Sequence, residues 1–403
     1  MPRYWMKVWI IVFVASLLTG CWDRDELNKL GLAIAVGLDW EDEQWKLSYQ
    51  VLVPSVIGGG MSPGAASGGA AVHVVSTQGK TIREATQKSS LENTRRLYFA
   101  HTDVMIIGEE AARHGIHEFL DLLFRFNASR VSVIVALTDG KASDLIRKLV
   151  LPEKYPGIAL TELIRQTSIM SSDYPTVRVY QLAQKITSES HAAGVPVIMA
   201  AQQSDPVMES EEENKKTSSP GAPKIVKLGV FQRDRLIGWL SREESQGLAW
   251  LTNQFKMGTI SIPISTRPGG YTSFRILRSK SRIKPIPGAE HFKMQVTVEV
   301  KGELMEYGGH MDLKSPESLR PIEHEVEKKV AYMVSRSWDA SRRLKADLPG
   351  FAGEIHRHYP KEWRQLSEHW DNELAALDLD VQVKAKLKRP GLLNKSFEQL
   401  LPH

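Results

Sequence analysis

Two short motifs in the sequence place a serine and a lysine at spacings known from enzymes. Gly60–Gly64 reads Gly-Met-Ser-Pro-Gly and matches G-x-S-x-G, in which the backbone N–H after the serine completes an oxyanion hole. Pro63 occupies that position and has no N–H to donate. Gly79-Lys80-Thr81 matches the end of a phosphate-binding loop, but Val74 stands where the first glycine is required. Neither motif therefore supports catalysis or nucleotide binding.

Two further pairs could act as a nucleophile with its base or as metal ligands. Ser281 and Lys284 have the S-x-x-K spacing, which needs a helix to bring both side chains to one face, whereas the surrounding pattern predicts a strand. His114 and His117 have helical spacing, but no third ligand accompanies them. We therefore expect no enzymatic activity, no metal and no cofactor.

The remaining reactive side chain is the thiol of Cys21, the only cysteine in the chain. Two basic residues precede Val8–Leu18, an 11-residue apolar run that is too short for a membrane span of about 20 residues. This pattern is typical of a secretory signal peptide over residues 1–20. Leu18-Thr19-Gly20-Cys21 resembles the lipobox of bacterial lipoproteins, in which the cysteine is linked to diacylglycerol and the chain is cut before it. The resemblance identifies Cys21 as a lipidation site; an uncleaved anchor with a coincidental cysteine is the alternative.

Composition narrows the class of protein. The 403 residues are 42% hydrophobic and 25% charged, as in globular proteins. Single cores stop growing at about 250–300 residues, so the length predicts two or three domains. A net charge of +5 is too small to indicate nucleic-acid binding. A single cysteine excludes a disulfide framework and a cysteine-based zinc site.

The order of strand and helix patterns predicts an α+β, multidomain fold, with three mixed domains after the signal peptide. The expected segments are a tether and strand hairpin at 21–60 (a first domain, completed by chain near 190–200), a middle α+β domain at 72–200, a charged linker or loop at 201–223, and a C-terminal α+β domain at 224–403.

Helix signals are clearest at three places. Apolar residues recur at intervals of three and four over Glu109–Phe126, which predicts one helix. Asp139 is expected to cap the helix that follows it. Ser315, as N-cap, begins a long amphipathic helix near 316–346 in the C-terminal domain. A hairpin over 227–240 is expected to open that domain.

Basic residues alternate along two expected strands of the C-terminal domain. If the strands were adjacent, they would form a patch that a lipid-anchored protein could press on anionic headgroups, at about 1 kcal/mol per basic residue. A solvated face whose lysines protect a sheet edge is the alternative, and it is favoured. The residues are Arg275, Arg278, Lys280, Arg282 and Lys284 in one strand, and Lys384, Lys386, Lys388 and Arg389 in the other.

Several segments resemble a single family along essentially the whole chain. Cys21–Asn28, with the sequence CWDRDELN, resembles the start of the mature C subunits of spore germinant receptors, the Ger(x)C lipoproteins. Ala33–Asp39 resembles the first strand and turn of that family. His101–Gly108 resembles the strand before the next helix, and Gly229–Leu240 resembles the hairpin that opens the C-terminal domain.

The resemblance implies a lipid-anchored, non-catalytic subunit of a nutrient germinant receptor that acts in spore germination. Such a subunit has three α+β domains and assembles with two integral membrane subunits, here called A and B. The complex sits in the spore inner membrane, with the C subunit on the extracytoplasmic face. No ligand-binding residues are implied.

Two other functions fit a lipidated protein. A solute-binding lipoprotein of a membrane transporter would need two similar lobes around a cleft, and the two halves of this chain are unlike. A cell-wall hydrolase would need paired carboxylates or a zinc site, and the sequence offers neither.

Overall fold

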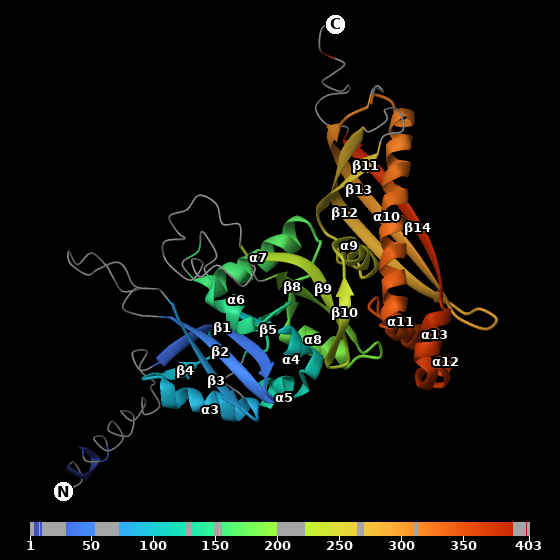
Figure 1. The fold of residues 1–403 in the computed structure, drawn as a ribbon. Helices are drawn as coiled ribbons and strands as arrows, with labels where there is room; N and C mark the ends of the chain where they lie inside the picture. Colours follow the sequence, from blue (N-terminus) through green and yellow to red (C-terminus); the bar gives the residue numbers. More distant parts are fainter. Residues whose placement is uncertain are drawn as a thin grey trace.

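The computed structural model describes residues 30–52, 72–125, 130–148, 155–199, 222–263, 270–309 and 313–389, with the short pieces 4–7, 9, 153 and 400. The described chain forms two sheets with packed helices, which confirms the α+β, multidomain fold (Figure 1). We call residues 30–240, around the larger sheet, the first unit. Residues 241–389, around the smaller sheet, are the second unit.

The larger sheet combines a parallel centre with antiparallel edges. Its order is β10-β9-β8-β6-β5-β1-β2-β3, with β4 paired to β1 and β7 to β6. Strands β8, β6, β5 and β1 are parallel neighbours, β4 is parallel to β1, and β9, β10, β2 and β3 add antiparallel pairs at the two edges. The strands are β1 Leu30–Glu41, β2 Gln44–Leu52, β3 Val72–Gly79, β4 Arg96–Tyr98, β5 Val104–Ile107, β6 Ile134–Thr138, β7 Val177–Arg178, β8 Ala192–Met199, β9 Lys224–Gln232 and β10 Arg235–Leu240.

Helices cover both faces of this sheet, and the central strands are apolar at nearly every position for that reason. In β5, Met105 and Ile107 face one helix layer while Val104 and Ile106 face the other. One layer contains α3 Ile82–Glu92, α4 Glu109–His114, α5 His117–Arg125 and α8 Val179–Ile186, and the other contains α6 Ala142–Arg147 and α7 Pro156–Met170.

The β9–β10 hairpin expected over 227–240 is confirmed, and it belongs to the larger sheet. β9 pairs with β8 in antiparallel register, with Ala193 opposite Phe231 and Val195 opposite Gly229. From the sequence, this hairpin was expected to open the C-terminal domain. In the structure, the first unit therefore takes its last two strands from chain beyond residue 223.

The single helix predicted over Glu109–Phe126 is wrong, because the chain forms α4 and α5 with a break at Gly115. Gly115 has a φ of 122°, which favours glycine. A Cβ there would lie 2.6 Å from Oδ2 of Asp234, and the N–H of Ile116 donates to the carbonyl of Asp234 at 3.0 Å. The β9–β10 turn thus occupies the place where a continuous helix would pass.

The prediction that Asp139 caps the next helix is also wrong. The N-cap of α6 is Lys141, and its side chain makes no capping hydrogen bond. The buried carboxylate of Asp39, at the end of β1, instead accepts hydrogen bonds from the N–H groups of Ala142 at 2.7 Å and Ser143 at 2.9 Å. A carboxylate at a helix N-terminus satisfies donors that have no partner inside the helix.

The smaller sheet has the order β11-β12-β13-β14, and the helices that the structure describes pack on one of its faces. Its strands are β11 Gly258–Pro263, β12 Tyr271–Ile286, β13 Lys293–Tyr307 and β14 Asp378–Arg389. β14 returns parallel to β13 after a long helical crossover. The helices of this unit are α9 Arg242–Leu251, α10 Pro316–Leu344, α11 Phe351–His358, α12 Pro360–Leu366, the 3₁₀ helix Ser367–His369 and α13 Trp370–Ala376.

The long helix α10 confirms the prediction near 316–346 and forms the centre of the second core. Ser315 is its N-cap, and its Oγ accepts from the N–H of Ser318 at 3.2 Å. Its buried stripe, which includes Val326, Val330 and Val334, packs with the inward side chains of β12 and β13. Helix α9 lies against α10 at Gly247, where a Cβ would meet the carbonyl oxygen of Met333 at 2.0 Å.

A separate apolar cluster joins the two units. Leu228 and Val230 of β9 pack in this cluster with Leu248 of α9 and with Ala340 and Leu348, which lie in and after α10. The junction is therefore a buried interface rather than a flexible hinge.

Candidate functional site

The structure places the rejected motifs in structural roles where it describes them. Cys21 and Gly60–Gly64 lie outside the described residues. Thr81 is the N-cap of α3: its Oγ1 accepts from the N–H of Glu84 at 3.1 Å, and the Glu84 carboxylate accepts from the N–H of Lys80 at 2.9 Å. This Gly-Lys-Thr sequence begins a helix through reciprocal capping and does not cradle a phosphate. Ser281 is buried and Lys284 exposed on β12, so they face opposite sides.

The histidine pair is divided between two different contacts. His114 stacks on Trp40, with ring centroids 3.7 Å apart. Nδ1 of His117 lies 2.8 Å from Oδ2 of Asp234. Across the described residues, no group of three His, Cys, Asp or Glu side chains could hold a metal ion.

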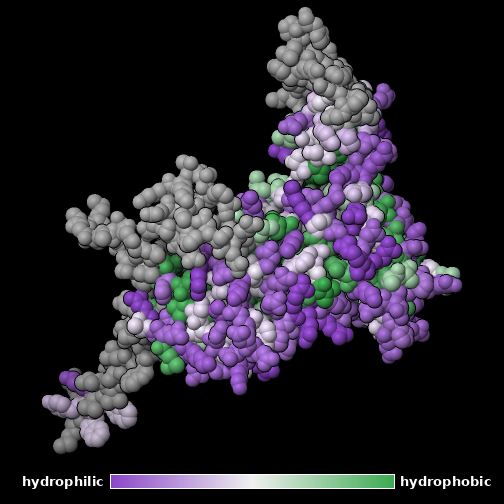
Figure 2. Space-filling model, in the orientation of Figure 1, coloured by the Kyte–Doolittle hydropathy of each residue, from purple (hydrophilic) through white to green (hydrophobic). Residues whose placement is uncertain are grey.

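None of the helices that the structure describes combines the length and the apolar character needed to cross a membrane. The side of the molecule drawn in Figure 2 is largely hydrophilic where it is coloured, with small separate hydrophobic patches. No broad apolar belt is visible on that side.

The two basic strands are not adjacent, because β13 lies between β12 and β14. β13 brings acidic residues into the same solvent-facing surface of the sheet. Glu303 pairs with Arg275, and Glu299 lies 3.5 Å from Arg282 and opposite Lys384 in register. β14 is an edge strand, where lysines hinder pairing with another chain. The face thus mixes basic and acidic residues.

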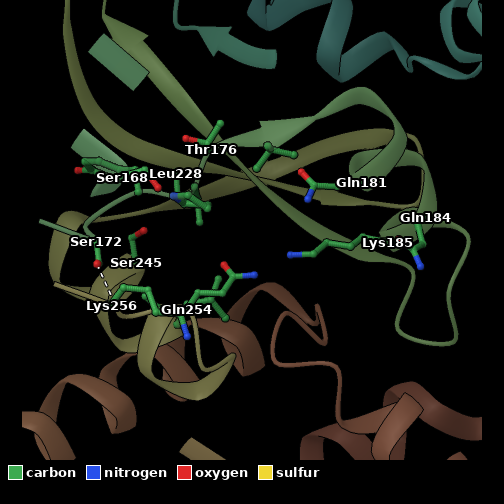
Figure 3. Close-up of a pocket in the computed structure, with 15 residues that line it drawn as sticks. Ser168, Ser172, Thr176, Gln181, Gln184, Lys185, Leu228, Ser245, Gln254 and Lys256 are labelled. Carbon is green, nitrogen blue, oxygen red and sulfur yellow. Dashed lines mark hydrogen bonds between the residues drawn. The ribbon is translucent and has the colours of Figure 1, made fainter. Parts of the chain in front are cut away.

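The most distinctive site is a cavity of about 350 Å³ at the junction of the two units (Figure 3). Its walls are the C-terminal end of α7 with the loop after it, the helix α8, and the helix α9 with the residues that follow it. Pro175, Val177 and Leu248 form an apolar part of the wall. None of the 15 residues that line the cavity is acidic.

Lys185 reaches into this cavity from the last turn of α8. Figure 3 shows its side chain directed from the helix toward the wall that carries Ser172 and Ser245. Within the part of the chain that the structure describes, its ammonium group has neither a hydrogen bond nor an ion pair. Burial lowers the pKa of Lys185 below its usual value, since desolvation disfavours the charged form.

Other polar side chains of the cavity wall lack protein partners too. Among the described residues, the side chains of Ser168, Tyr174, Thr176 and Gln254 make no hydrogen bond. Burial raises the pKa of Tyr174 to about 12, so its phenol stays neutral and can donate. The wall thus offers hydroxyl and amide groups around the ammonium group of Lys185.

Short contacts fix the loop after α7 against the second unit. Ser172 has a φ of 52°, and its Oγ accepts from the N–H groups of Lys256 at 3.0 Å and Met257 at 3.1 Å. Ser245 of α9 donates to the carbonyl of Asp173 at 2.6 Å. The two sides of the cavity are therefore held together by hydrogen bonds from both units.

Comparison with protein families identifies the chain. A model described as "Spore germination protein N-terminal domain" matches residues 23–200. A second, described as "Spore germination B3/ GerAC like, C-terminal", matches residues 227–391. The chain belongs to the GerAC family of spore germination proteins. The chain is thus of the germinant-receptor C-subunit type that its sequence resembles, within a family of spore germination proteins.

The matches to individual relatives cover nearly the whole length of this chain. Spore germination protein KC of Bacillus subtilis (strain 168) is 27% identical, and the match covers 99% of this chain and 98% of that protein. Spore germination protein B3 of the same organism is 27% identical, covering 96% and 99%. Spore germination protein A3 is 26% identical, covering 94% and 97%.

One solved structure resembles this chain in fold. The match to "Crystal Structure of the GerBC protein" has a TM-score of 0.55 and covers 91% of this chain and 100% of that chain. At 20% identity, the likeness concerns the fold alone.

The cavity was missed by the sequence analysis, and the position of Lys185 in its helix shows why. Val179, Leu182 and Ile186 form the buried stripe of α8. Lys185 follows Leu182 by three residues and precedes Ile186, so it lies at the border of that stripe. A lysine at such a position ordinarily lays its stem along apolar surface and keeps its ammonium group in water, so its place in the sequence does not predict a cavity.

Proposed function

We propose that this protein is a non-catalytic subunit of a nutrient germinant receptor, held on the extracytoplasmic face of the spore inner membrane by a diacylglycerol on Cys21. The observation that carries the proposal is the position of the only cysteine, directly after a short apolar run and a Leu-Thr-Gly sequence, in a chain of this family. Two acyl chains give stable anchoring where one is marginal.

The anchor acts through geometry rather than chemistry. Nine residue steps separate Cys21 from Leu30, the first residue of β1, and they span at most about 32 Å. The first unit therefore stays close to the membrane in which the partners lie. Confinement to two dimensions raises the effective concentration of the subunit for these partners.

The partners in this proposal are the integral membrane subunits A and B. The names of the relatives, A3, B3 and KC, support a setting with several subunits. The rejected motifs support a non-catalytic role, since Lys80 and Thr81 begin a helix and Ser281 and Lys284 face opposite sides of a strand.

A solute-binding lipoprotein of a membrane transporter is not favoured. Such a protein has two similar lobes around a cleft, whereas this chain has a larger sheet covered on both faces and a four-stranded sheet covered on one. Its family membership also points away from a transporter.

Isolation of the tagged chain from detergent-solubilised spore membranes, followed by mass spectrometry, tests the partner assignment. We expect two multi-span subunits to copurify. An ATP-driven permease in their place would contradict the proposal.

The anchor is tested separately with Cys21→Ala. We expect loss of the acyl modification by mass spectrometry and loss of nutrient-triggered germination, with normal abundance of the protein. Ser55→Ala, which leaves the cysteine unchanged, is the control. Full germination with an unmodified chain would overturn the tethering mechanism.

A further inference from the structure

The charged residues that line the junction cavity favour a negatively charged ligand. The lining carries two lysines and no carboxylate. The ammonium of Lys256 donates to the carbonyl of Asn253 at 2.8 Å, so its position is fixed by the protein. The nearby carboxylate of Asp173 is already bonded to Arg242 at 2.7 Å and to Gln246. Of the two lysines that line the cavity, Lys256 is exposed to solvent, whereas Lys185 is the partly buried one, and no described protein group contacts its ammonium.

Lys185 stands in an environment that is costly for an unpaired charge. An ammonium group carries three donors and no acceptor, and a buried charge needs a counter-charge or hydrogen bonds. Its place in the last turn of α8 favours a cation through the helix dipole, which helps to keep it protonated. Solvation is reduced at the same time, because the side chain lies partly buried between the two units.

Beyond the proposed receptor function, and independently of it, we propose that this cavity binds a small organic carboxylate, with the carboxylate on the ammonium group of Lys185. The phenol of Tyr174, the hydroxyl of Thr176 and the amide of Gln254 are available for polar groups on the rest of the molecule. Val177 and Leu248 provide apolar contact for its carbon atoms.

Three observations favour an organic carboxylate over an inorganic anion. About 350 Å³ is at the lower end of the range for small-molecule pockets and far larger than a phosphate ion needs. Part of the wall is apolar, which an inorganic anion would not use. Phosphate sites usually combine several cationic or backbone donors, whereas here Lys185 is the one partly buried lysine of the lining and Lys256 is exposed and bonded to the carbonyl of Asn253.

Such a ligand would contact both units at once. Lys185 and Thr176 belong to the first unit, while Leu248 and Gln254 belong to the second. A molecule bound between them stabilises their arrangement by mass action, because it binds only when both walls are in place. The ligand would therefore couple the first unit to the helices of the second unit.

Calorimetry on the full lipidated chain in detergent tests the charge requirement. The probes are acetate, N-acetylglycine and glutarate, each compared with its uncharged amide, and inorganic phosphate. We expect at least one carboxylate to bind at least tenfold more tightly than its amide, and Lys185→Met to weaken that binding at least tenfold. Lys88→Met, which removes a half-exposed lysine of α3 that pairs with Glu84 and does not line the cavity, is the charge-matched control and should bind normally.

A second measurement needs no variant. Acetylation by an amine-reactive ester, read out by mass spectrometry, should be slowed at Lys185 by the carboxylate and unchanged at Lys88. Two results would overturn the proposal: no carboxylate binds or protects better than its amide, or phosphate alone does so. Copurification of the membrane subunits is independent of either result, so the two proposals can fail separately.

Discussion

The hydroxyl group of Ser190 donates a 2.8 Å hydrogen bond to the carboxylate of Asp347, across the boundary between the two units. Both residues are buried. The same carboxylate accepts from the backbone N–H groups of Gly350 at 3.0 Å, Phe351 at 2.9 Å and Ala352 at 2.8 Å. One side chain thus caps α11 and ties it to the turn before β8.

We expect Asp347→Ala to lower the free energy of unfolding by about 2–4 kcal/mol, because it removes a helix cap and leaves buried donors without partners. Ser190→Ala keeps the cap and should cost about 1 kcal/mol. Urea unfolding of the detergent-solubilised chain measures both. Equal costs for the two variants would show that the cap contributes little.

Close packing between α9 and α10 should make Gly247 intolerant of a side chain. The Cβ of Gly247→Ala would meet the carbonyl oxygen of Met333 at 2.0 Å, so the helices must separate. We expect a loss of about 1–3 kcal/mol in stability, measured by urea unfolding. Gly140→Ala is the matched control, since its Cβ would meet nothing within 4 Å. An unchanged midpoint for Gly247→Ala would contradict this packing.

Membrane retention should depend on Cys21 and not on the basic strands. Since Glu303 and Glu299 already pair with Arg275 and Arg282 on the open sheet face, we expect Cys21→Ala to appear mainly in the soluble fraction at physiological salt. Fractionation with immunodetection measures this. Membrane retention of Cys21→Ala would contradict this expectation. If that retention is lost at raised salt, and also when Lys384→Gln and Lys386→Gln are added, it would indicate contact with anionic headgroups.

Lys185 should give the chain a stability that rises with pH. Burial holds its folded pKa below the value of 10.5 for a free lysine. Below the folded pKa both states are protonated, and the buried charge carries a constant cost. Between the folded pKa and 10.5 the unfolded state binds more protons, so the wild type gains stability as pH rises. Lys185→Met should be the more stable protein at neutral pH.

Denaturant unfolding of the wild type and Lys185→Met at a series of pH values measures this difference. The advantage of the methionine variant should shrink as pH rises toward 10.5. A difference independent of pH would mean that Lys185 pairs with a group that keeps its pKa unshifted.

The elements that depend on local pattern were predictable from the sequence. Ser315 and Pro316 begin α10 as expected, since a cap and a first-turn proline act within a few residues. The two errors have long-range causes. α4 and α5 separate because the turn at Asp234 approaches Gly115, and α6 is capped by Asp39, about a hundred residues earlier. Periodicity within one segment carries no information about such contacts.

The candidate site was less predictable than the fold. The cavity exists only where α8 of the first unit meets α9 of the second, and no motif spans these segments. Its most informative residue, Lys185, looks in the sequence like any polar residue on an amphipathic helix. The family resemblance, in contrast, could be recognised because Cys21–Asn28 and the β9–β10 hairpin are continuous segments.

The pairing of β8 with β9 has a consequence for recombination among relatives. The two family models divide the chain between residues 200 and 227, yet this division falls between strands that share one sheet. A hybrid gene joined there would build that sheet from two parents, with unmatched side chains along β8. Crossovers that preserve both partners belong after β10, beyond residue 240.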